Sequence, residues 1–240
     1  MKIWLNRLPS AFPRATELFR QAGFDAIAIS SLKAQPIDVH AHPIIINFDQ
    51  FSDIVVTSPE TSNWLIDAVK SRWVQWPAGQ TIWAVGNTTA EIMICEGCSV
   101  ELADEVGSAA LVTRMRENLS VDQRVLVASG VDGGLQFDSL NHLVAIPVAH
   151  LELFDLVPHG QLKAEDVNHM TAIVHGSAAL LSEFLNEVSR INANVTQILH
   201  FVTSSNAQSQ LPSGSRYYRV PTPSPEQVKL VLQGEPSVKD

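Results

Sequence analysis

The sequence predicts an α/β fold of two domains, each with a parallel sheet flanked by helices. Short apolar runs rich in β-branched residues alternate with about 10 to 15 residues of helical pattern, which is typical of βαβ units. Two stretches, residues 33–43 and 143–157, interrupt this alternation, and we expect them to carry the chain between domains. The chain has 240 residues, 45% of them hydrophobic, which is enough for one large or two smaller cores.

The clearest strand-to-helix junction lies at residues 53–68, where the apolar run DIVV ends in Thr57, Ser58 and Pro59 and a helical pattern follows. Gly23 stops the first helix, which begins near Ala11. In chain order, strands are expected at 2–6, 25–30, 53–58, 81–85, 99–103, 124–129, 171–175, 197–204 and 216–220. Helices are expected to end near Ala22, Val74, Gly97, Asn118, His142, Arg190 and Gln233, with a short helix after residue 204.

The two interrupting stretches differ in character. Residues 33–43 are polar and contain two prolines and two histidines. Residues 143–157 are long and apolar, but Pro147 would interrupt a central strand because it has no N–H to donate. We therefore read both as crossings rather than as ordinary turns.

Composition excludes several classes of function. Sixteen basic and twenty-five acidic residues give a net charge of −9, which argues against broad contact with nucleic acid or an anionic membrane. No apolar run approaches the roughly 20 residues that span a bilayer, and the start lacks a signal-peptide core. With only two cysteines, these features predict a cytoplasmic protein.

Small or helix-capping residues follow most of the predicted strands. Helix N-termini at the carboxyl edge of a parallel sheet bind anions through free backbone N–H groups, and two such edges facing each other would form a cleft lined with donors. Taken singly, each junction is also an ordinary helix cap. The strand ends are Asn6-Arg7, Thr57-Ser58, Gly86-Asn87-Thr88-Thr89, Ser129-Gly130, Gly176-Ser177 and Thr203-Ser204-Ser205.

Other motifs point to no metal or nucleotide. Cys95 and Cys98 form a lone C-x-x-C at a predicted helix end, whereas a redox pair needs the helix start and a zinc site a second pair. The glycine-rich residues 127–134 lack the lysine of a P-loop and the G-x-G-x-x-G order of a dinucleotide site.

Several segments, in this order and spacing, carry a family resemblance. They are the opening strand ending in Arg7, DIVVTSP at 53–59, AVGNTTAEIM at 84–93, SAALVTRM at 108–115, RVLVASG at 124–130, HFVTSSNAQSQL at 200–211 and VPTPSPEQVKLVL at 220–232. Over nearly its whole length the chain resembles the uroporphyrinogen-III synthases. The resemblance implies two flavodoxin-like domains, residues 1–35 with 155–240 and residues 42–147, joined by linkers at 36–41 and 148–154.

The resemblance also implies an activity, that of a cyclising lyase in tetrapyrrole (heme or siroheme) biosynthesis. The family converts hydroxymethylbilane to uroporphyrinogen III with inversion of ring D and loss of water, without a metal or organic cofactor, and a monomer is expected. A diverged, non-catalytic tetrapyrrole-binding or interaction module of the same fold is the alternative. The implied substrate-binding residues are Arg7, Thr57, Ser58, Gly86, Asn87, Thr89, Ser129, Gly130, Ser177, Thr203 and Ser204.

The chain departs from the family pattern at two places. A tyrosine proposed to assist the leaving hydroxyl corresponds here to Ala149 or His150. If it corresponds to His150, an imidazolium could donate the proton, although an ordinary half-exposed histidine is the other reading. Basic residues common in the family near positions 129 and 134 are Ser129 and Gly134 here, so two carboxylate contacts are missing.

Overall fold

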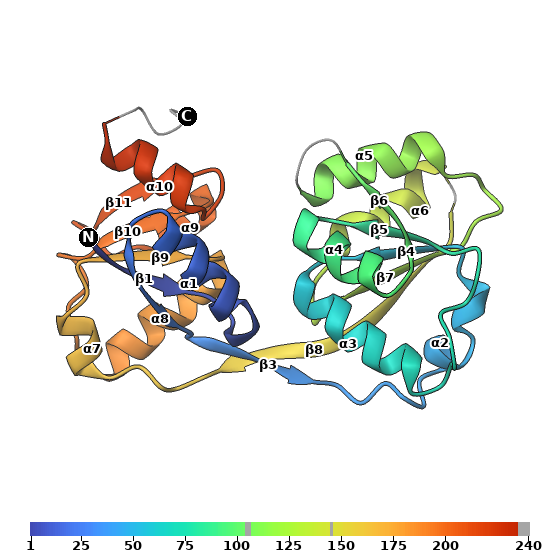
Figure 1. Cartoon of the computed structure of the whole chain (residues 1–240), viewed down its shortest axis with the longest axis horizontal. Coiled ribbons are helices and arrows are strands. Elements are labelled where there is room, and N and C mark those ends of the chain that lie inside the picture. Colours follow the sequence, from blue (N-terminus) through green and yellow to red (C-terminus); the bar gives the residue numbers. More distant parts are fainter. Residues whose placement is uncertain (104–106, 145, 235–240) are drawn as a thin grey trace. The chain divides into compact units, whose positions relative to one another are not determined.

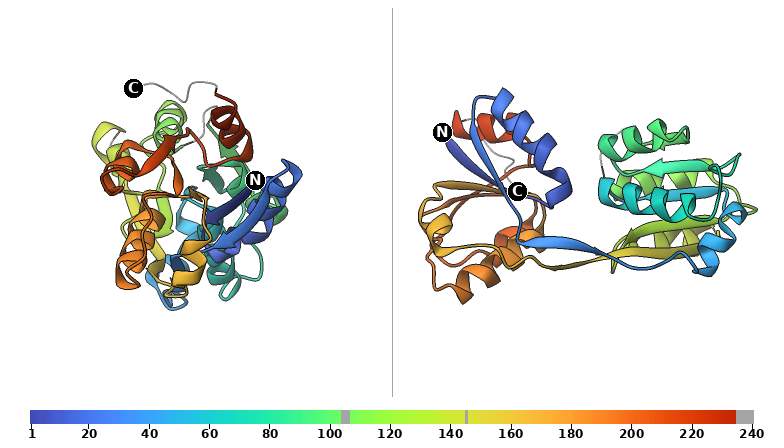
Figure 2. Two further views of the ribbon diagram at one scale, coloured as in Figure 1. Left: turned by 90° about the vertical axis from the view of Figure 1, so that its left-hand side faces the viewer. Right: turned by 60° about the horizontal axis from the view of Figure 1, so that its bottom comes forward.

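The computed structural model describes residues 1–103, 107–144 and 146–234. The chain divides into two compact units (Figure 1). Unit 1 comprises Met1–Lys33 and Val157–Asp240, and unit 2 comprises Ala34–Leu156. Each unit has a sheet with helices on both faces (Figure 2). The predicted α/β class with parallel sheets flanked by helices is therefore confirmed.

Unit 1 contains a five-stranded sheet in the order β11-β10-β9-β1-β2, and every described pair is parallel. The strands are β1 (Lys2–Asn6), β2 (Asp25–Ile29), β9 (Ala172–His175), β10 (Leu199–Val202) and β11 (Arg216–Arg219). The helices are α1 (Phe12–Gln21), α7 (Ala164–Asn168), α8 (Ala178–Arg190), α9 (Ser205–Gln210) and α10 (Pro225–Leu232). Since all strands run the same way, their carboxyl ends meet at one edge.

Alternation along β1 explains the two cores of unit 1. Ile3 and Leu5 pack on one face with residues of α1 and α10, whereas Trp4 packs on the other with residues of α7 and α8. Because both faces are buried, the strand reads as a continuous apolar run rather than an alternating one.

Unit 2 contains a six-stranded sheet in the order β3-β8-β7-β4-β5-β6. The strands are β3 (Leu32–Pro36), β4 (Asp53–Val56), β5 (Thr81–Ala84), β6 (Ser99–Leu102), β7 (Val125–Gly130) and β8 (Val148–Pro158). The helices are α2 (Pro43–Ile46), α3 (Pro59–Lys70), α4 (Asn87–Cys95), α5 (Ser108–Asn118) and α6 (Ser139–Val144). Short 3-10 turns occupy Pro9–Ala11, Phe48–Gln50 and Leu135–Asp138.

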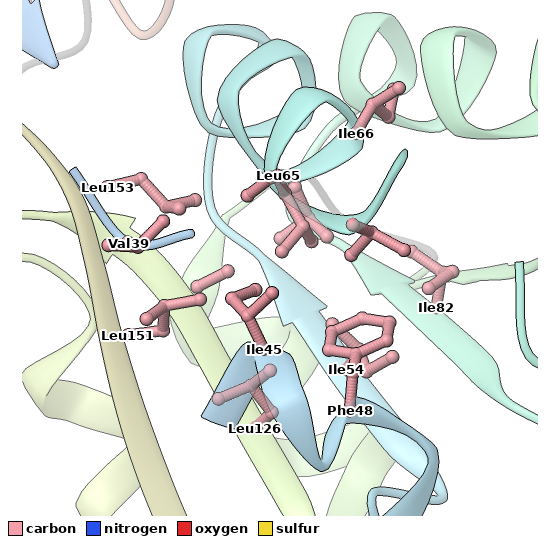
Figure 3. Packing of buried hydrophobic residues seen from close by; sticks show 14 of the residues in the cluster. Val39, Ile45, Phe48, Ile54, Leu65, Ile66, Ile82, Leu126, Leu151 and Leu153 are labelled. Atoms are coloured by element: carbon pink, nitrogen blue, oxygen red, sulfur yellow. The ribbon is translucent and has the colours of Figure 1, made fainter. Parts of the chain in front are cut away.

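One core of unit 2 lies between α3 and the sheet (Figure 3). Leu65 of α3, Phe48 and the strand residues Ile54 and Leu126 are all fully buried there. The opposite face of the sheet packs Val127 and its neighbours against α5 and the Leu135–Asp138 turn. None of the helices in the described ranges is long and apolar enough to cross a membrane.

The stretch read as the second crossing is a strand. Residues 148–154 belong to β8, which pairs in parallel with β7 from Val125 opposite Val148 to Gly130 opposite Phe154. Pro147 does not interrupt it, because Pro147 precedes the strand and only its carbonyl is used, accepting from Val125 N at 3.1 Å. Two further elements, β3 and α7, were not expected from the sequence pattern.

Candidate functional site

Arg7 lies where several strand ends of unit 1 meet. Its backbone N–H donates to the Ile29 carbonyl at 3.0 Å, beside the end of β2. Its side chain runs over Gly176, since a Cβ placed on Gly176 would lie 2.8 Å from the Arg7 Cδ and 3.0 Å from Nη1. Arg7 Nη2 donates to the carbonyl of Pro223, after β11. The guanidinium therefore spans the carboxyl ends of β1 and β9 and the loop that follows β11.

The charge of Arg7 has no acidic counterpart among the described residues. Burial lowers the pKa of Arg7 to about 10. Its Nε is buried and has no hydrogen-bond partner. A mostly buried cation without a counter-ion is energetically unfavourable, and a bound anion would relieve that cost. Arg7 is therefore a candidate anion-binding position.

Two helices begin just after the residues that the Arg7 side chain contacts. They are α8, which follows Gly176, and α10, which follows Pro223. Ser177 caps α8, its Oγ accepting from Leu180 N at 3.3 Å. Ser224 follows Pro223 and caps α10, accepting from Gln227 N at 3.4 Å. The positive ends of both helix dipoles add to the attraction for an anion. Ser204 caps the short α9 in the same way at 3.1 Å and follows Thr203 at the end of β10.

The carboxyl edge of the unit 2 sheet also carries predicted site residues. Ser58 caps α3, accepting from Thr61 N at 3.1 Å. The Thr57 hydroxyl donates to the Ala128 carbonyl at 3.2 Å, so this hydroxyl can only accept from a ligand. Gly86 precedes α4 without a side-chain cap, which leaves first-turn N–H groups available, and Asn87 is exposed.

Three predicted residues do not present side chains to a ligand. Thr89 is only 2% exposed and Ser129 only 1%. The Ser129 hydroxyl donates within its own loop, to the carbonyl of Gly130 at 2.9 Å or of Gly133 at 3.0 Å. Gly130 lies under the Phe154 ring, which would be 2.8 Å from an added Cβ. Here these positions serve packing.

His150 and Ala149 point to opposite faces of β8. Ala149 packs against the core under α3. His150 is opposite Val127 in the register, two residues before the level of Ser129, so its backbone lies about 7 Å short of the carboxyl edge. Its Nε2 contacts the Asp138 Oδ1 at 2.6 Å. Neither residue therefore offers an acid at the edge of the sheet.

Around Arg7, His175 and Pro223 were not expected from the sequence, and Asn6 was named only as a strand end and not as a site residue. Asn6 and His175 are bonded across 169 positions of sequence, and Arg7 and Pro223 across 216, so no local motif reveals these contacts. Only the small residue Gly176, at a strand end, hinted at a close approach. No cluster of three or more histidine, cysteine or acidic residues in the described ranges could hold a metal ion.

Comparisons with known proteins bear on the family and the fold. The family profile described as "HEM4: Uroporphyrinogen-III synthase HemD" matches residues 14–165. No curated protein matches the sequence. The structure of uroporphyrinogen-III synthetase from Helicobacter pylori is similar, with a TM-score of 0.62 and 12% identity, covering 97% of this chain and 98% of that one.

A mutant uroporphyrinogen III synthase from Thermus thermophilus is similar with a TM-score of 0.55 and 11% identity, covering 97% of this chain and 98% of that one. At such low identity the two structures show a shared fold, whereas the family profile covers more than half of the sequence. The chain belongs to the uroporphyrinogen-III synthase HemD family.

Proposed function

We propose that the protein is a uroporphyrinogen-III synthase, which cyclises hydroxymethylbilane with inversion of ring D and loss of water. The observation that carries the proposal is Arg7, a mostly buried cation without an acidic partner in the described part of the chain, at the carboxyl edge of its sheet. Family membership supplies the reaction, and this cation supplies a reason for the edge to bind a carboxylate-rich substrate.

Donor groups at the carboxyl edge of the unit 1 sheet would bind the substrate. The substrate presents several carboxylates, and the partly exposed guanidinium of Arg7 can donate to one of them. The first turns of α8 and α10 add backbone donors. A hydrogen bond to a charged group contributes about 1.5–3 kcal/mol, so a few such contacts suffice for binding even though the protein is acidic overall.

The reaction asks mainly for positioning. Departure of the hydroxyl leaves a cationic azafulvene that the electron-rich pyrrole already favours. The protein must then hold the terminal ring so that it closes through a spiro intermediate instead of directly. We assign no side-chain acid to this step, because the His150 imidazole contacts Asp138 instead of the edge.

The test is the isomer formed. Hydroxymethylbilane is generated in place, the product is oxidised, and uroporphyrins I and III are separated by chromatography. Spontaneous closure gives isomer I, so isomer III that rises with added protein supports a synthase. Isomer I alone, from folded protein, would refute the activity.

A second function, a tetrapyrrole-binding module without turnover, is favoured by one observation. Ala149 is packed in the core and His150 is paired, so β8 lacks the family's acid at the edge. Under this alternative the same assay yields only isomer I, while fluorescence titration with uroporphyrin, the stable oxidised product, still shows saturable binding that Arg7→Ala weakens.

A further inference from the structure

A buried chain of hydrogen bonds lies directly behind Arg7. His200 Nε2 is 3.2 Å from the Val195 carbonyl, which can only accept, so Nε2 carries the proton. His200 Nδ1 must then accept from His175 Nε2, at 3.1 Å. His175 Nδ1 must in turn accept from Asn6 Nδ2, at 3.2 Å. The partners thus assign one tautomer to each ring.

The Asn6 amide completes the chain. Its second Nδ2 hydrogen goes to the Leu180 carbonyl at 3.0 Å. Its Oδ1 accepts from both Ser31 N, at 3.2 Å, and Ser31 Oγ, at 3.1 Å. Every side-chain nitrogen and oxygen of Asn6, His175 and His200 therefore has a partner of the correct kind. We call these three residues the relay.

The relay is buried and neutral. Asn6 and His200 are 0% exposed and His175 is 1% exposed, and the two imidazole planes are nearly parallel, 6° apart, with ring centroids separated by 5.4 Å. Burial, then the neighbouring His200 and Arg7, hold the pKa of His175 well below its usual value. An added proton on either Nδ1 would put a donor against a donor, so this hydrogen-bond pattern requires both rings to be neutral.

The relay fixes the surface over which Arg7 runs. Asn6 and His175 are opposite each other in the β1–β9 register and end their strands. The Asn6 carbonyl accepts from Gly176 N at 3.0 Å, and the Arg7 side chain runs over that same Gly176. The side-chain bond between Asn6 and His175 thus joins the two backbones on either side of the guanidinium.

We propose that Asn6, His175 and His200 are positioning residues, which hold Arg7 in the orientation that binds a substrate carboxylate. The identity of the anion rests on the proposed function, but the orientation of Arg7 does not. Apolar side chains of similar volume would fill these positions at no greater cost, whereas a fully satisfied polar chain specifies one arrangement.

The test compares His175→Phe with His175→Gln. Phenylalanine fills the space but cannot form these hydrogen bonds, whereas glutamine offers an acceptor oxygen and a donor nitrogen in place of the acceptor and donor nitrogens of the imidazole. We expect the dissociation constant for uroporphyrin to rise about tenfold in His175→Phe and to change less than threefold in His175→Gln. In turnover assays KM should rise with kcat nearly unchanged, a split that general destabilisation would not give.

Two NMR signals test the proposal without activity. The Arg7 Nε–H signal, assigned by its loss in Arg7→Lys, should be sharp and slowly exchanging in the wild type and in His175→Gln, and broadened in His175→Phe. Long-range nitrogen spectra of the folded wild type should show both imidazoles neutral with protons on Nε2. Either an unchanged Arg7 signal in folded His175→Phe, or the opposite tautomer in the wild type, would overturn the proposal. Isomer I alone from the folded wild type would instead refute the proposed function, without changing either NMR result.

Discussion

Replacing Gly176 by alanine should displace Arg7 with little effect on folding. The backbone of Gly176 is not in the left-handed region, so alanine can adopt it. The new Cβ would lie 2.8 Å from the Arg7 Cδ and 3.0 Å from Nη1, while the nearest backbone atom, the Asn6 carbonyl oxygen, is 3.3 Å away. The overlap is therefore relieved by moving the flexible Arg7 side chain off its position.

The size of the effect follows from what is lost. Unfolding free energy should change by no more than about 1 kcal/mol, because alanine also restricts the unfolded chain and offsets part of the displacement. Binding should lose the charge-assisted contact of Arg7, about 1.5–3 kcal/mol, which corresponds to a rise of roughly 10- to 150-fold in the dissociation constant.

The assay is a fluorescence titration with uroporphyrin beside a urea denaturation curve. Arg7→Ala should weaken binding by a similar factor. The double variant with Gly176→Ala and Arg7→Ala should bind no more weakly than Arg7→Ala alone, since both changes remove the same contact. Gly176→Ala protein that binds uroporphyrin as tightly as the wild type would refute the placement of Arg7 in the site.

Three further predictions concern residues outside that contact. Ser129→Ala should lower the unfolding free energy by about 1 kcal/mol, since it removes a buried donor, and leave uroporphyrin affinity unchanged; weakened affinity would return Ser129 to the site. His150→Ala should keep its isomer III yield and lose at most about 1 kcal/mol of stability, as a partly exposed pair with Asp138; a loss of isomer III in folded protein would identify His150 as the acid. Burial lowers the pKa of His200 from 6.5 to about 4. Between these two pH values the unfolded chain binds more protons than the folded chain, so the unfolding free energy falls as the pH drops from 6.5, by about 3 kcal/mol at pH 4. Urea denaturation at a series of pH values should show a smaller loss of unfolding free energy in His200→Gln than in the wild type. An equal pH dependence of stability in the two proteins would contradict a neutral buried His200.

Local chemistry explains why much of the fold can be predicted from the sequence. Ser58, Ser177 and Ser204 follow apolar runs and do cap helices, because a serine oxygen satisfies an N–H that the helix leaves unpaired. The helix expected to end near Asn118 is α5, which does end at Asn118. Pro147 was expected to interrupt a strand, but it lies directly before β8, and the sequence pattern alone does not settle whether a proline falls inside a strand or before it.

The candidate site was less accessible to sequence reasoning. Thr89 and Ser129 have the residue types of ligand contacts, but their exposure depends on neighbouring segments that pack over them. The relay joins Asn6 to His175 and His200 across β1, β9 and β10, so its members become neighbours only in the folded sheet. Arg7 was expected in the site from the family resemblance, whereas its burial and its unpartnered Nε were not predictable from the sequence.

The most direct test of the account is the fraction of isomer III formed from hydroxymethylbilane by the wild type and Arg7→Ala at matched concentrations, with substrate below saturation. We predict that the wild type yields predominantly isomer III, and that Arg7→Ala shifts the product toward isomer I in proportion to its weaker binding. Isomer I alone from folded wild-type protein would contradict the synthase activity, and equal isomer III from both proteins would contradict the role of Arg7.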